Sequence, residues 1–254
     1  MKKEEIKETQ LIGIEQQPNM FALACANMIL RGDGKTHIYQ KNYFSMTDTI
    51  REKHKCTVGF LNPPYSQKGE GLHELNFVSN CLDSIEKNGI VVAIVPISCA
   101  TTPTPQKEDL LKKHTLEAVM SMPNELFNPV GIITCIMVFR AKVPHDSKKY
   151  TWFGFWKNDE FEKTKHEGRI DKHGKWIETK NKWIESYRER KEISEECVLH
   201  KVTAEDEWVA EAYMKTDYSN IRENDFLNMI KKYTIFKIQN EEMFDEEDEK
   251  NATL

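Results

Sequence analysis

The residues best suited to chemistry in this chain are Asn62-Pro63-Pro64-Tyr65. They follow the apolar run 57–61, which predicts a buried strand, and the two prolines must end that strand because proline supplies no ladder N–H. Sheets of the α/β class bind ligands in the crevice at the carboxyl ends of their strands. The turn would present an amide, a free carbonyl and an aromatic ring to that crevice.

Those groups match the needs of a planar base held by its exocyclic amine. The Asn62 amide oxygen and the Pro63 carbonyl could both accept from an adenine N6 amine while the Tyr65 ring stacks on the base. Two acceptors would aim the nitrogen lone pair at an electrophilic methyl group. No general base is needed before the transfer, because the amine becomes acidic only once it carries the methyl. A strand followed by a proline turn is also common in α/β proteins, so these four residues alone leave both interpretations open.

Two further polar residues end predicted strands. Glu15 closes the apolar run 11–14, and a carboxylate at the tip of the second strand accepts from ribose hydroxyls in nucleotide-binding α/β folds. Asn42 follows the predicted strand 36–39 and could reach the same crevice. A solvated glutamate and a turn residue without a role are the simpler interpretations.

The six cysteines form no CxxC pair and the histidines show no ligand spacing, so we predict no metal site.

The elements that would position these residues alternate between strands and helices. Strands are predicted by continuous apolar runs and helices by apolar residues at helical spacing. This pattern predicts a largely parallel sheet, covered by helices on both faces and containing one antiparallel strand. The further predicted helices are 19–31, 72–88 and 106–114, and the further predicted strands are 90–95, 116–120 and 132–139.

The character of the sequence changes after Arg140. We predict an edge strand at 150–156, a hairpin over 169–177 that turns at His173-Gly174, and helices at 206–215 and 224–233. Tryptophans among the lysines of this region could stack on bases, but packing of a small extension onto the main domain is the favoured interpretation. Residues 241–249 carry seven acids in nine positions, which predicts a disordered tail.

The composition argues against several classes of function. The 254-residue chain has a net charge of −5, which argues against a strongly basic nucleic-acid clamp. Six unpaired cysteines, mostly inside apolar runs, indicate a reduced, cytoplasmic protein. No apolar run approaches the roughly 18 residues that would span a bilayer, and we recognise no signal peptide.

Several motifs together resemble the adenine-N6 DNA methyltransferases, most closely the modification (M) subunit of type I restriction systems. They follow one another in that family's order and span about 12–140: residues 13–18, 38–42, Asn62-Pro63-Pro64-Tyr65 and 127–135. The resemblance implies a Rossmann-like α/β sheet that uses S-adenosylmethionine. It divides the chain into a partial catalytic domain (1–145), a charged α+β extension (146–240) and an acidic tail (241–254).

The resemblance also implies roles. Asn62 and Pro63 of the Asn-Pro-Pro-Tyr motif would hold the N6 amine of a flipped adenine, and Tyr65 would stack on it. Glu15 would bind the ribose of S-adenosylmethionine. Asn42 stands near the cofactor's adenine, where the family usually has an aspartate after a glycine, here Lys41. An amide can donate or accept but lacks the charge of a carboxylate.

One departure from the family is larger. The family's sheet begins with a strand and a Gly-rich loop that lies against the cofactor's methionine part, and residues 1–10 offer no equivalent. We expect either a gap of roughly one strand spacing, ~4.8 Å, or direct pairing of the neighbouring strands.

Two hypotheses follow from this departure. The chain is part of a site-specific DNA adenine methyltransferase, weak or inactive alone, and acts with DNA, a specificity subunit and a chain or segment that supplies the loop. Alternatively, it is an inactive truncated fold that binds DNA or restriction subunits. RNA or protein methylation is a third, less favoured possibility, because the family match leans to DNA.

Overall fold

The computed structural model describes residues 2–32, 37–67, 69, 71–127, 131–164, 167–215 and 222–239. The chain divides into two compact units, Met1–Met214 and Lys215–Leu254. Within the described part of the second unit lies one helix, α8 (Glu223–Gln239), which confirms the helix predicted at 224–233. The predicted acidic tail lies outside the described residues, and the boundary predicted near residue 145 stays a prediction.

The first unit is built on a six-stranded sheet with the order β10-β7-β5-β6-β4-β3. β3 is parallel to β4, β5 is parallel to β7, and β6 is antiparallel to both β4 and β5. The α/β sheet is confirmed and β6 is an antiparallel strand as predicted, but β10 is antiparallel too, so the sheet has two antiparallel strands where we predicted one. The strands are β3 (Val58–Leu61), β4 (Ile90–Pro96), β5 (Thr115–Ser121), β6 (Thr134–Arg140), β7 (Thr151–Phe155) and β10 (Cys197–His200).

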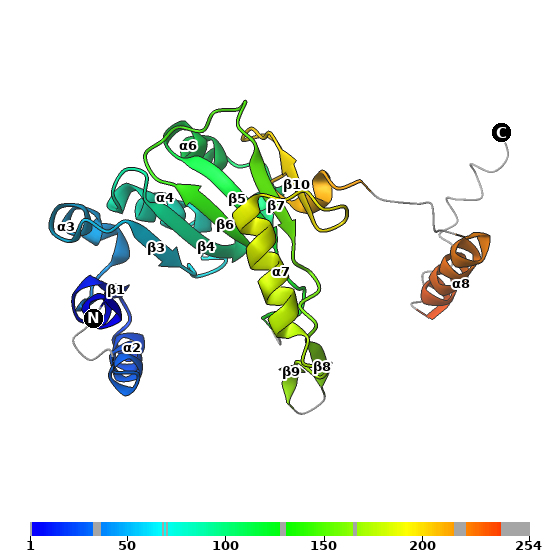
Figure 1. Ribbon diagram of the computed structural model, residues 1–254, viewed down its shortest axis with the longest axis horizontal. Helices are drawn as coiled ribbons and strands as arrows, with labels where there is room; N and C mark the ends of the chain where they lie inside the picture. The colour runs from blue at the N-terminus through cyan, green and yellow to red at the C-terminus, as the bar shows by residue number, and fades with distance from the viewer. Residues whose placement is uncertain are drawn as a thin grey trace. The chain divides into compact units, whose positions relative to one another are not determined.

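Helices cover the two faces of this sheet unequally. In Figure 1, α4 (Glu74–Ser84) and α6 (Pro105–Lys113) lie behind the sheet, and α7 (Trp176–Glu189) lies in front of it. The larger core lies between the sheet and α4 and α6, whereas α7 packs over the β5–β7 side. At the β3 edge the second face is open, since Phe60 is 78% exposed and Val58 is 52% exposed.

Gly59 brings β3 close to α4. A Cβ at Gly59 would collide with the Cys81 sulfur on the facing helix. Glycine therefore permits the close approach of helix α4 and strand β3.

The first two strands form a sheet of their own. β1 (Ile12–Glu15) pairs in parallel with β2 (His37–Gln40), and α2 (Pro18–Leu30) connects them. Among the described residues β1 and β3 do not pair, so the direct pairing that we gave as one alternative is not formed, and the gap of one strand spacing stays a prediction. No residue of α2 is buried, so this β-α-β segment lacks a packed core of its own.

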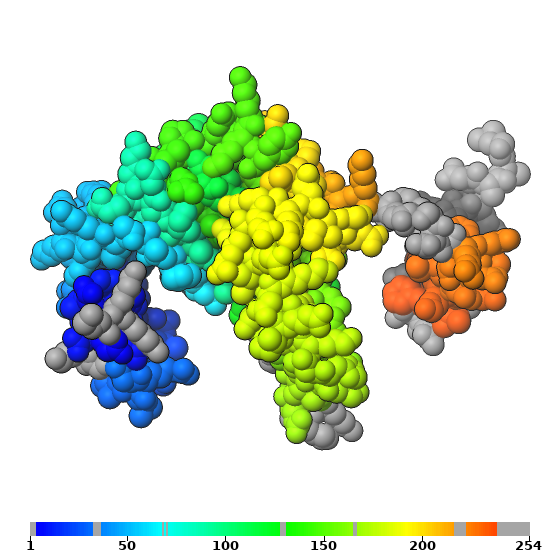
Figure 2. Space-filling view, viewed as in Figure 1, coloured from blue at the N-terminus to red at the C-terminus, as the bar shows by residue number. Residues whose placement is uncertain are grey.

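The C-terminal part of the first unit corrects three predictions. The strand predicted at the edge, β7, lies inside the sheet between β5 and β10. The hairpin predicted at 169–177 is wrong, because the Asp171 carboxylate accepts from the backbone N–H groups of Lys175 and Trp176 and so starts helix α7. The hairpin of this region instead joins β8 (Glu162–Thr164) and β9 (Gly168–Ile170), whose yellow-green atoms adjoin the yellow surface of α7 in Figure 2.

The helix predicted at 206–215 is also wrong. The backbone N–H of Trp208 donates to the Ala100 carbonyl, and the Asp206 carbonyl accepts from Lys107, so this backbone bonds to distant segments instead of forming helical turns. Only the short 3₁₀ helix η4 (Ala210–Ala212) forms there. The remaining short helices are α1 (Lys2–Glu5), η1 (Ile6–Gln10), η2 (Tyr43–Met46), α3 (Thr47–Thr49), η3 (Ile50–His54) and α5 (Ser98–Thr101).

The six cysteines are all free thiols, and three of them are buried. This agrees with the expectation of reduced cysteines. None of the helices in the described ranges has the length and apolar character that crossing a bilayer requires.

Candidate functional site

The Asn62 turn leaves β3 at the edge of the sheet where the parallel strands β3, β4, β5 and β7 have their carboxyl ends. Asn62 is exposed, Pro63 is buried and the Tyr65 ring is half-buried. The Tyr65 hydroxyl donates to the Asn62 Oδ1 at 2.6 Å and lies 3.4 Å from the Ile94 carbonyl. The turn is therefore a preorganised unit, in which the ring hydroxyl orients the amide.

Both acceptors that the sequence singled out remain available. The Pro63 carbonyl accepts no hydrogen bond from any described residue. The Asn62 Oδ1 accepts only from Tyr65 in the same part of the chain, and an amide oxygen has two lone pairs. An amine placed at this edge would find one oxygen without a described donor and one that can accept a second hydrogen bond.

Tyr65 cannot act as a base near neutral pH. Burial, followed by the neighbouring Cys135, Cys99 and Glu74, raises the pKa of Tyr65 to about 12. The phenol stays protonated and keeps donating to Asn62. In the structure this hydrogen bond orients the Asn62 amide.

A second ring faces Tyr65 from another loop. Phe127, in the connection after β5, meets the Tyr65 ring edge to face at a centroid distance of 6.2 Å. Phe127 is the first residue of the last matching motif, but the sequence analysis assigned it no role. The sequence around it does not show that the loop after β5 returns to β3. Asn128, Pro129 and Val130 of that motif lie outside the described residues, as does Lys68 beyond the Asn62 turn.

Glu15 ends strand β1 of the separate β1–β2 sheet, and Asn42 follows strand β2 of that sheet as the N-cap residue of η2. Glu15, the last residue of β1, pairs in register with Gln40, which ends β2 two residues before Asn42. One Glu15 oxygen accepts from the Gln17 N–H at 2.7 Å, and the other has no hydrogen bond to the described residues. The Asn42 Oδ1 accepts from the Phe44 N–H at 2.9 Å and caps η2, while its amide NH₂ has no described partner.

These two residues meet part of the requirement for a nucleoside ligand. A free carboxylate oxygen can accept from ribose hydroxyls and a free amide NH₂ can donate to a ring nitrogen. The structure gives Asn42 a local capping role that the sequence analysis did not identify. It places Glu15 and Asn42 at strand ends of the β1–β2 sheet and the Asn62 turn after a strand of the six-stranded sheet.

Sequence reasoning missed one buried residue at the site. Glu74, the first residue of α4, is 8% exposed, and its carboxylate accepts from the backbone N–H of Ser66, directly after Tyr65, at 2.7 Å. An acid at the start of the helix that follows the motif was the available signal, but its contact with Ser66 depends on how the intervening loop folds.

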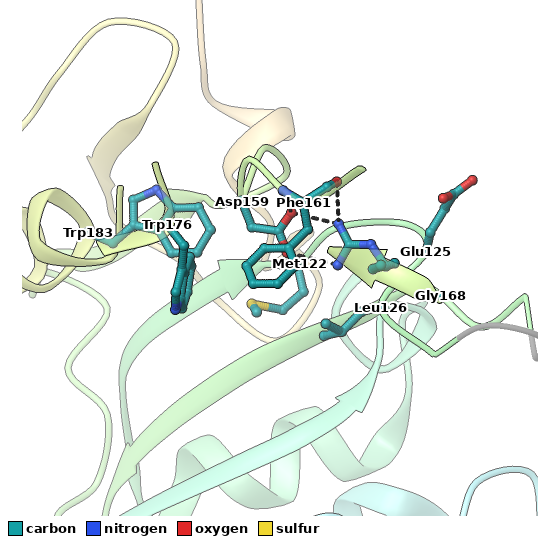
Figure 3. Close-up of a pocket in the computed structure, with 9 residues that line it drawn as sticks. Met122, Glu125, Leu126, Asp159, Phe161, Gly168, Trp176 and Trp183 are labelled. Carbon is teal, nitrogen blue, oxygen red and sulfur yellow. Dashed lines mark hydrogen bonds and ion pairs between the residues drawn. The ribbon is translucent and has the colours of Figure 1, made fainter. Parts of the chain in front are cut away.

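An aromatic pocket lies beside the loop after β5. It has a volume of about 450 Å³, and Arg169 in its wall forms an ion pair of 2.6 Å with Asp159 (Figure 3). Trp183 stacks on Trp156 with a centroid distance of 4.9 Å. The lining residues are Met122, Glu125, Leu126, Asp159, Phe161, Gly168, Arg169, Trp176 and Trp183.

The tryptophans of this region differ in their environment. Trp208 is fully buried against Phe139 and Lys107, which agrees with the packing interpretation. Trp176 and Trp183 are half-buried and form one wall of the pocket, so part of each ring still faces solvent.

Comparison with known proteins assigns the family. The model of the family described as N-6 DNA Methylase matches residues 1–242, nearly the whole chain. This chain belongs to the N-6 DNA methylase family.

One curated relative is the type II restriction enzyme and methyltransferase RM.BcgI of Heyndrickxia coagulans. It is 34% identical over 174 residues, which cover 65% of this chain and 27% of the relative. The chain thus spans about a quarter of that protein's length, so its similarity concerns one part of a larger enzyme.

Two solved structures share the fold. A modification subunit of a putative type I restriction enzyme from Vibrio vulnificus YJ016 superposes with a TM-score of 0.62 at 16% identity, over 85% of this chain and 50% of that one. A type I restriction-modification complex gives 0.65 at 19% identity, over 93% of this chain and 54% of that one. The chain therefore shares the α/β fold of these two structures and spans about half of each.

Proposed function

We propose that this chain forms the base-binding part of a site-specific DNA adenine-N6 methyltransferase of a restriction-modification system. The observation that carries the proposal is the pair of free acceptors, the Asn62 Oδ1 and the Pro63 carbonyl, beside the half-buried Tyr65 ring. A flipped adenine would donate its N6 amine to both oxygens and stack on the ring. The resulting site selects a base with an exocyclic amine.

Each residue of the Asn62 turn would have its own role in the reaction. Asn62 and Pro63 withdraw the N6 hydrogens from the ring plane and leave the lone pair to attack, and the Tyr65 hydroxyl holds the Asn62 amide in place. S-adenosylmethionine would supply the electrophilic methyl group. Once methylated, the amine is acidic enough to release its proton to solvent, so the protonated phenol of Tyr65 is not required as a base.

Glu15 and Asn42 would contribute to the cofactor site. The free oxygen of Glu15 suits the ribose hydroxyls, and the free NH₂ of Asn42 suits the adenine of S-adenosylmethionine. Because an amide lacks the charge of the family's usual aspartate, the contribution of Asn42 to affinity is expected to be modest.

We further propose that another segment, from the same polypeptide or from a partner chain, completes the sheet between β1 and β3. The support is the lack of pairing between these strands, the exposed Phe60 on β3 and the unburied helix α2. An unpaired edge of this kind accepts an added strand. That segment would also bring the loop that contacts the methionine part of the cofactor.

The first test is calorimetric titration of the chain with S-adenosylmethionine, alongside Glu15→Ala. We expect no measurable binding by the isolated chain, and binding lost on Glu15→Ala once the completing segment is present. Micromolar binding by the isolated chain would show that the site forms without that segment.

The second test is transfer of a radiolabelled methyl group to DNA by the complete enzyme. Asn62→Ala should abolish the label on adenine while DNA binding persists. Unchanged labelling in this variant would refute the proposal.

The second candidate function is an inactive methyltransferase fold that binds DNA or restriction subunits. The break between the two sheets favours it, because it separates Glu15 from the Asn62 turn. DNA or subunit binding without any methyl transfer by the completed assembly would identify this function.

A further inference from the structure

A buried carboxylate lies under the turn that follows Tyr65. Glu74 accepts from the Ser66 N–H at 2.7 Å and is shielded from solvent. A hydrogen bond with an ionised acceptor is about twice as strong as a neutral one, and burial strengthens it further because water competes less. Glu74 therefore fixes the backbone one residue beyond the aromatic ring of the site.

The backbone at Ser66 needs such a partner. Its φ is +55°, in the left-handed region that residues other than glycine rarely adopt. Strained conformations of this kind persist only where the surrounding structure holds them. The bond from Ser66 to Glu74 stabilises the reversal that directs the chain away from β3 and leaves Tyr65 beside Asn62.

Glu74 is itself firmly held. It lies in the first turn of α4, where the helix dipole favours a negative charge. The next residue, Leu75, is fully buried in the core, as is Val78 one turn later. Helix α4 is thus held rigidly by the core, and the hydrogen bond between Ser66 and Glu74 ties the turn to this helix.

We infer that Glu74 is a positioning residue for the Asn62 turn, acting through the Ser66 N–H rather than by contact with the substrate. This inference rests on the proposed function. It explains why an acid is buried here although its carboxylate has no partner side chain of opposite charge among the described residues.

A metal ion is the competing explanation for the same residues. Ligand atoms of His73, Glu74 and Cys99 lie within 4.8 Å of one another. However, His73 already accepts from the Leu75 N–H through Nδ1, and Glu74 already accepts from Ser66. Burial, followed by the nearby Glu74, raises the pKa of Cys99 to about 12. The hydrogen bonds in place account for the cluster without a metal.

The test compares Glu74→Ala with Glu74→Gln. Glutamine keeps an oxygen that can accept from Ser66, whereas alanine removes it. Asp206→Ala is the matched control, because the Asp206 carboxylate accepts from the Thr203 N–H at the same distance of 2.7 Å, in the segment after β10. Exchange of the Ser66 amide hydrogen is measured on the chain, and kcat and the KM for S-adenosylmethionine are measured on the complete methyltransferase.

In Glu74→Ala we expect the Ser66 amide to exchange roughly 10- to 100-fold faster and kcat to fall by a similar factor, with KM for the cofactor nearly unchanged. Glu74→Gln should restore both, and Asp206→Ala should change neither. A uniform loss of stability would raise exchange throughout the chain, so it is distinguished from a local effect at Ser66.

Three results would overturn the inference. One is unchanged Ser66 exchange in Glu74→Ala. Another is a Glu74→Gln variant that keeps Ser66 protected but is as slow as Glu74→Ala, because the charge and not the position would then matter. The third is stoichiometric zinc in the purified protein that Glu74→Ala loses. A wild-type enzyme that transfers no methyl group would refute the proposed function alone, and the exchange comparison would still decide whether Glu74 positions the turn.

Discussion

At the scale of single residues, the site depends on acceptor groups that accept one hydrogen bond within the described residues and can accept a second one. The Asn62 Oδ1 accepts from Tyr65 and can accept once more, and Glu15 uses one of its two oxygens locally. Such groups are oriented before any ligand arrives, which lowers the cost of ordering them on binding. The two halves of the Tyr65 side chain can therefore be tested separately.

Tyr65→Ala removes the aromatic face and the bond to Asn62, whereas Tyr65→Phe removes only the bond. Base stacking is worth about 1–3 kcal/mol, so Tyr65→Ala should lower kcat/KM for DNA by roughly 10- to 100-fold. Tyr65→Phe should cost less, on the order of several-fold, because the ring remains. Initial rates of methyl transfer by the complete enzyme measure both. Equal losses in the two variants would contradict a stacking role.

Lys107 is the clearest structural residue outside the site. It is fully buried, donates to the carbonyls of Ala100 and Asp206, and lies 4.5 Å from the Trp208 ring centroid. Lys107→Met leaves the Asp206 carbonyl without a donor, at about 1–3 kcal/mol, and removes one of the two donors to the Ala100 carbonyl, which keeps the Trp208 N–H. We expect the free energy of unfolding to fall by roughly 2–4 kcal/mol in urea denaturation, with Lys113→Met, on the exposed face of α6, as the neutral control. A loss below about 0.5 kcal/mol would contradict this account.

At the scale of elements, the joints between helices and strands hold the main sheet together. His114, between α6 and β5, is fully buried, and its Nδ1 accepts from the Lys142 N–H after β6. Burial lowers the pKa of His114 to about 4, with nearby Asp83 opposing and Lys113 and Lys142 adding to the shift. The histidine is neutral in the folded protein at neutral pH, and this joint should weaken in acid.

The sign of the pH effect follows from the two pKa values. In the unfolded chain His114 binds a proton near its ordinary pKa of 6.5, whereas in the folded protein it does so only near 4. The contribution of His114 to the free energy of unfolding is therefore fully present above pH 6.5 and is lost as the pH falls from 6.5 towards 4. The loss amounts to about 3 kcal/mol at pH 4. Urea unfolding at pH 7 and pH 4 should show this extra loss in the wild type relative to His114→Gln, which accepts from Lys142 without titrating. Parallel losses in the two proteins would assign the acid sensitivity to other groups.

At the scale of the whole molecule, the β-α-β segment of residues 12–40 is the least supported part of the first unit. A two-stranded sheet is marginally stable in water, and α2 buries none of its residues. By contrast, β4 and β6 lie inside the six-stranded sheet and contribute fully buried residues to the core. Stability should therefore be distributed unevenly along the chain.

Hydrogen exchange tests this distribution. In the isolated chain we expect the amides of β1 and β2 to exchange at least ~100-fold faster than those of β4 and β6, because local opening exposes little apolar surface. Addition of a polypeptide that completes the sheet between β1 and β3 should slow the first group and leave the second unchanged. Equal protection of both groups in the isolated chain would show that the segment is stable without further pairing.

The sequence by itself determined the local features of this protein. Apolar runs and helical spacing placed the strands and helices of the sheet, and the two prolines after Leu61 fixed the turn of the site, because these signals act between residues close in the chain. They failed at 169–177, where a turn forms at His173-Gly174 but helix α7 follows it in place of a second strand, with the Asp171 carboxylate accepting from the N–H groups of Lys175 and Trp176.

Only the tertiary structure decided which distant residues meet. The contacts of Phe127 with Tyr65 and of Glu74 with Ser66 depend on loops whose paths no local pattern specifies. The interior place of β7 depends on pairing with β10, some forty residues later in the chain. Interactions between residues close in the chain therefore determine the Asn62 turn and its strand. Long-range packing determines the contacts that Glu74 and Phe127 make with this turn and the place of β7 in the sheet.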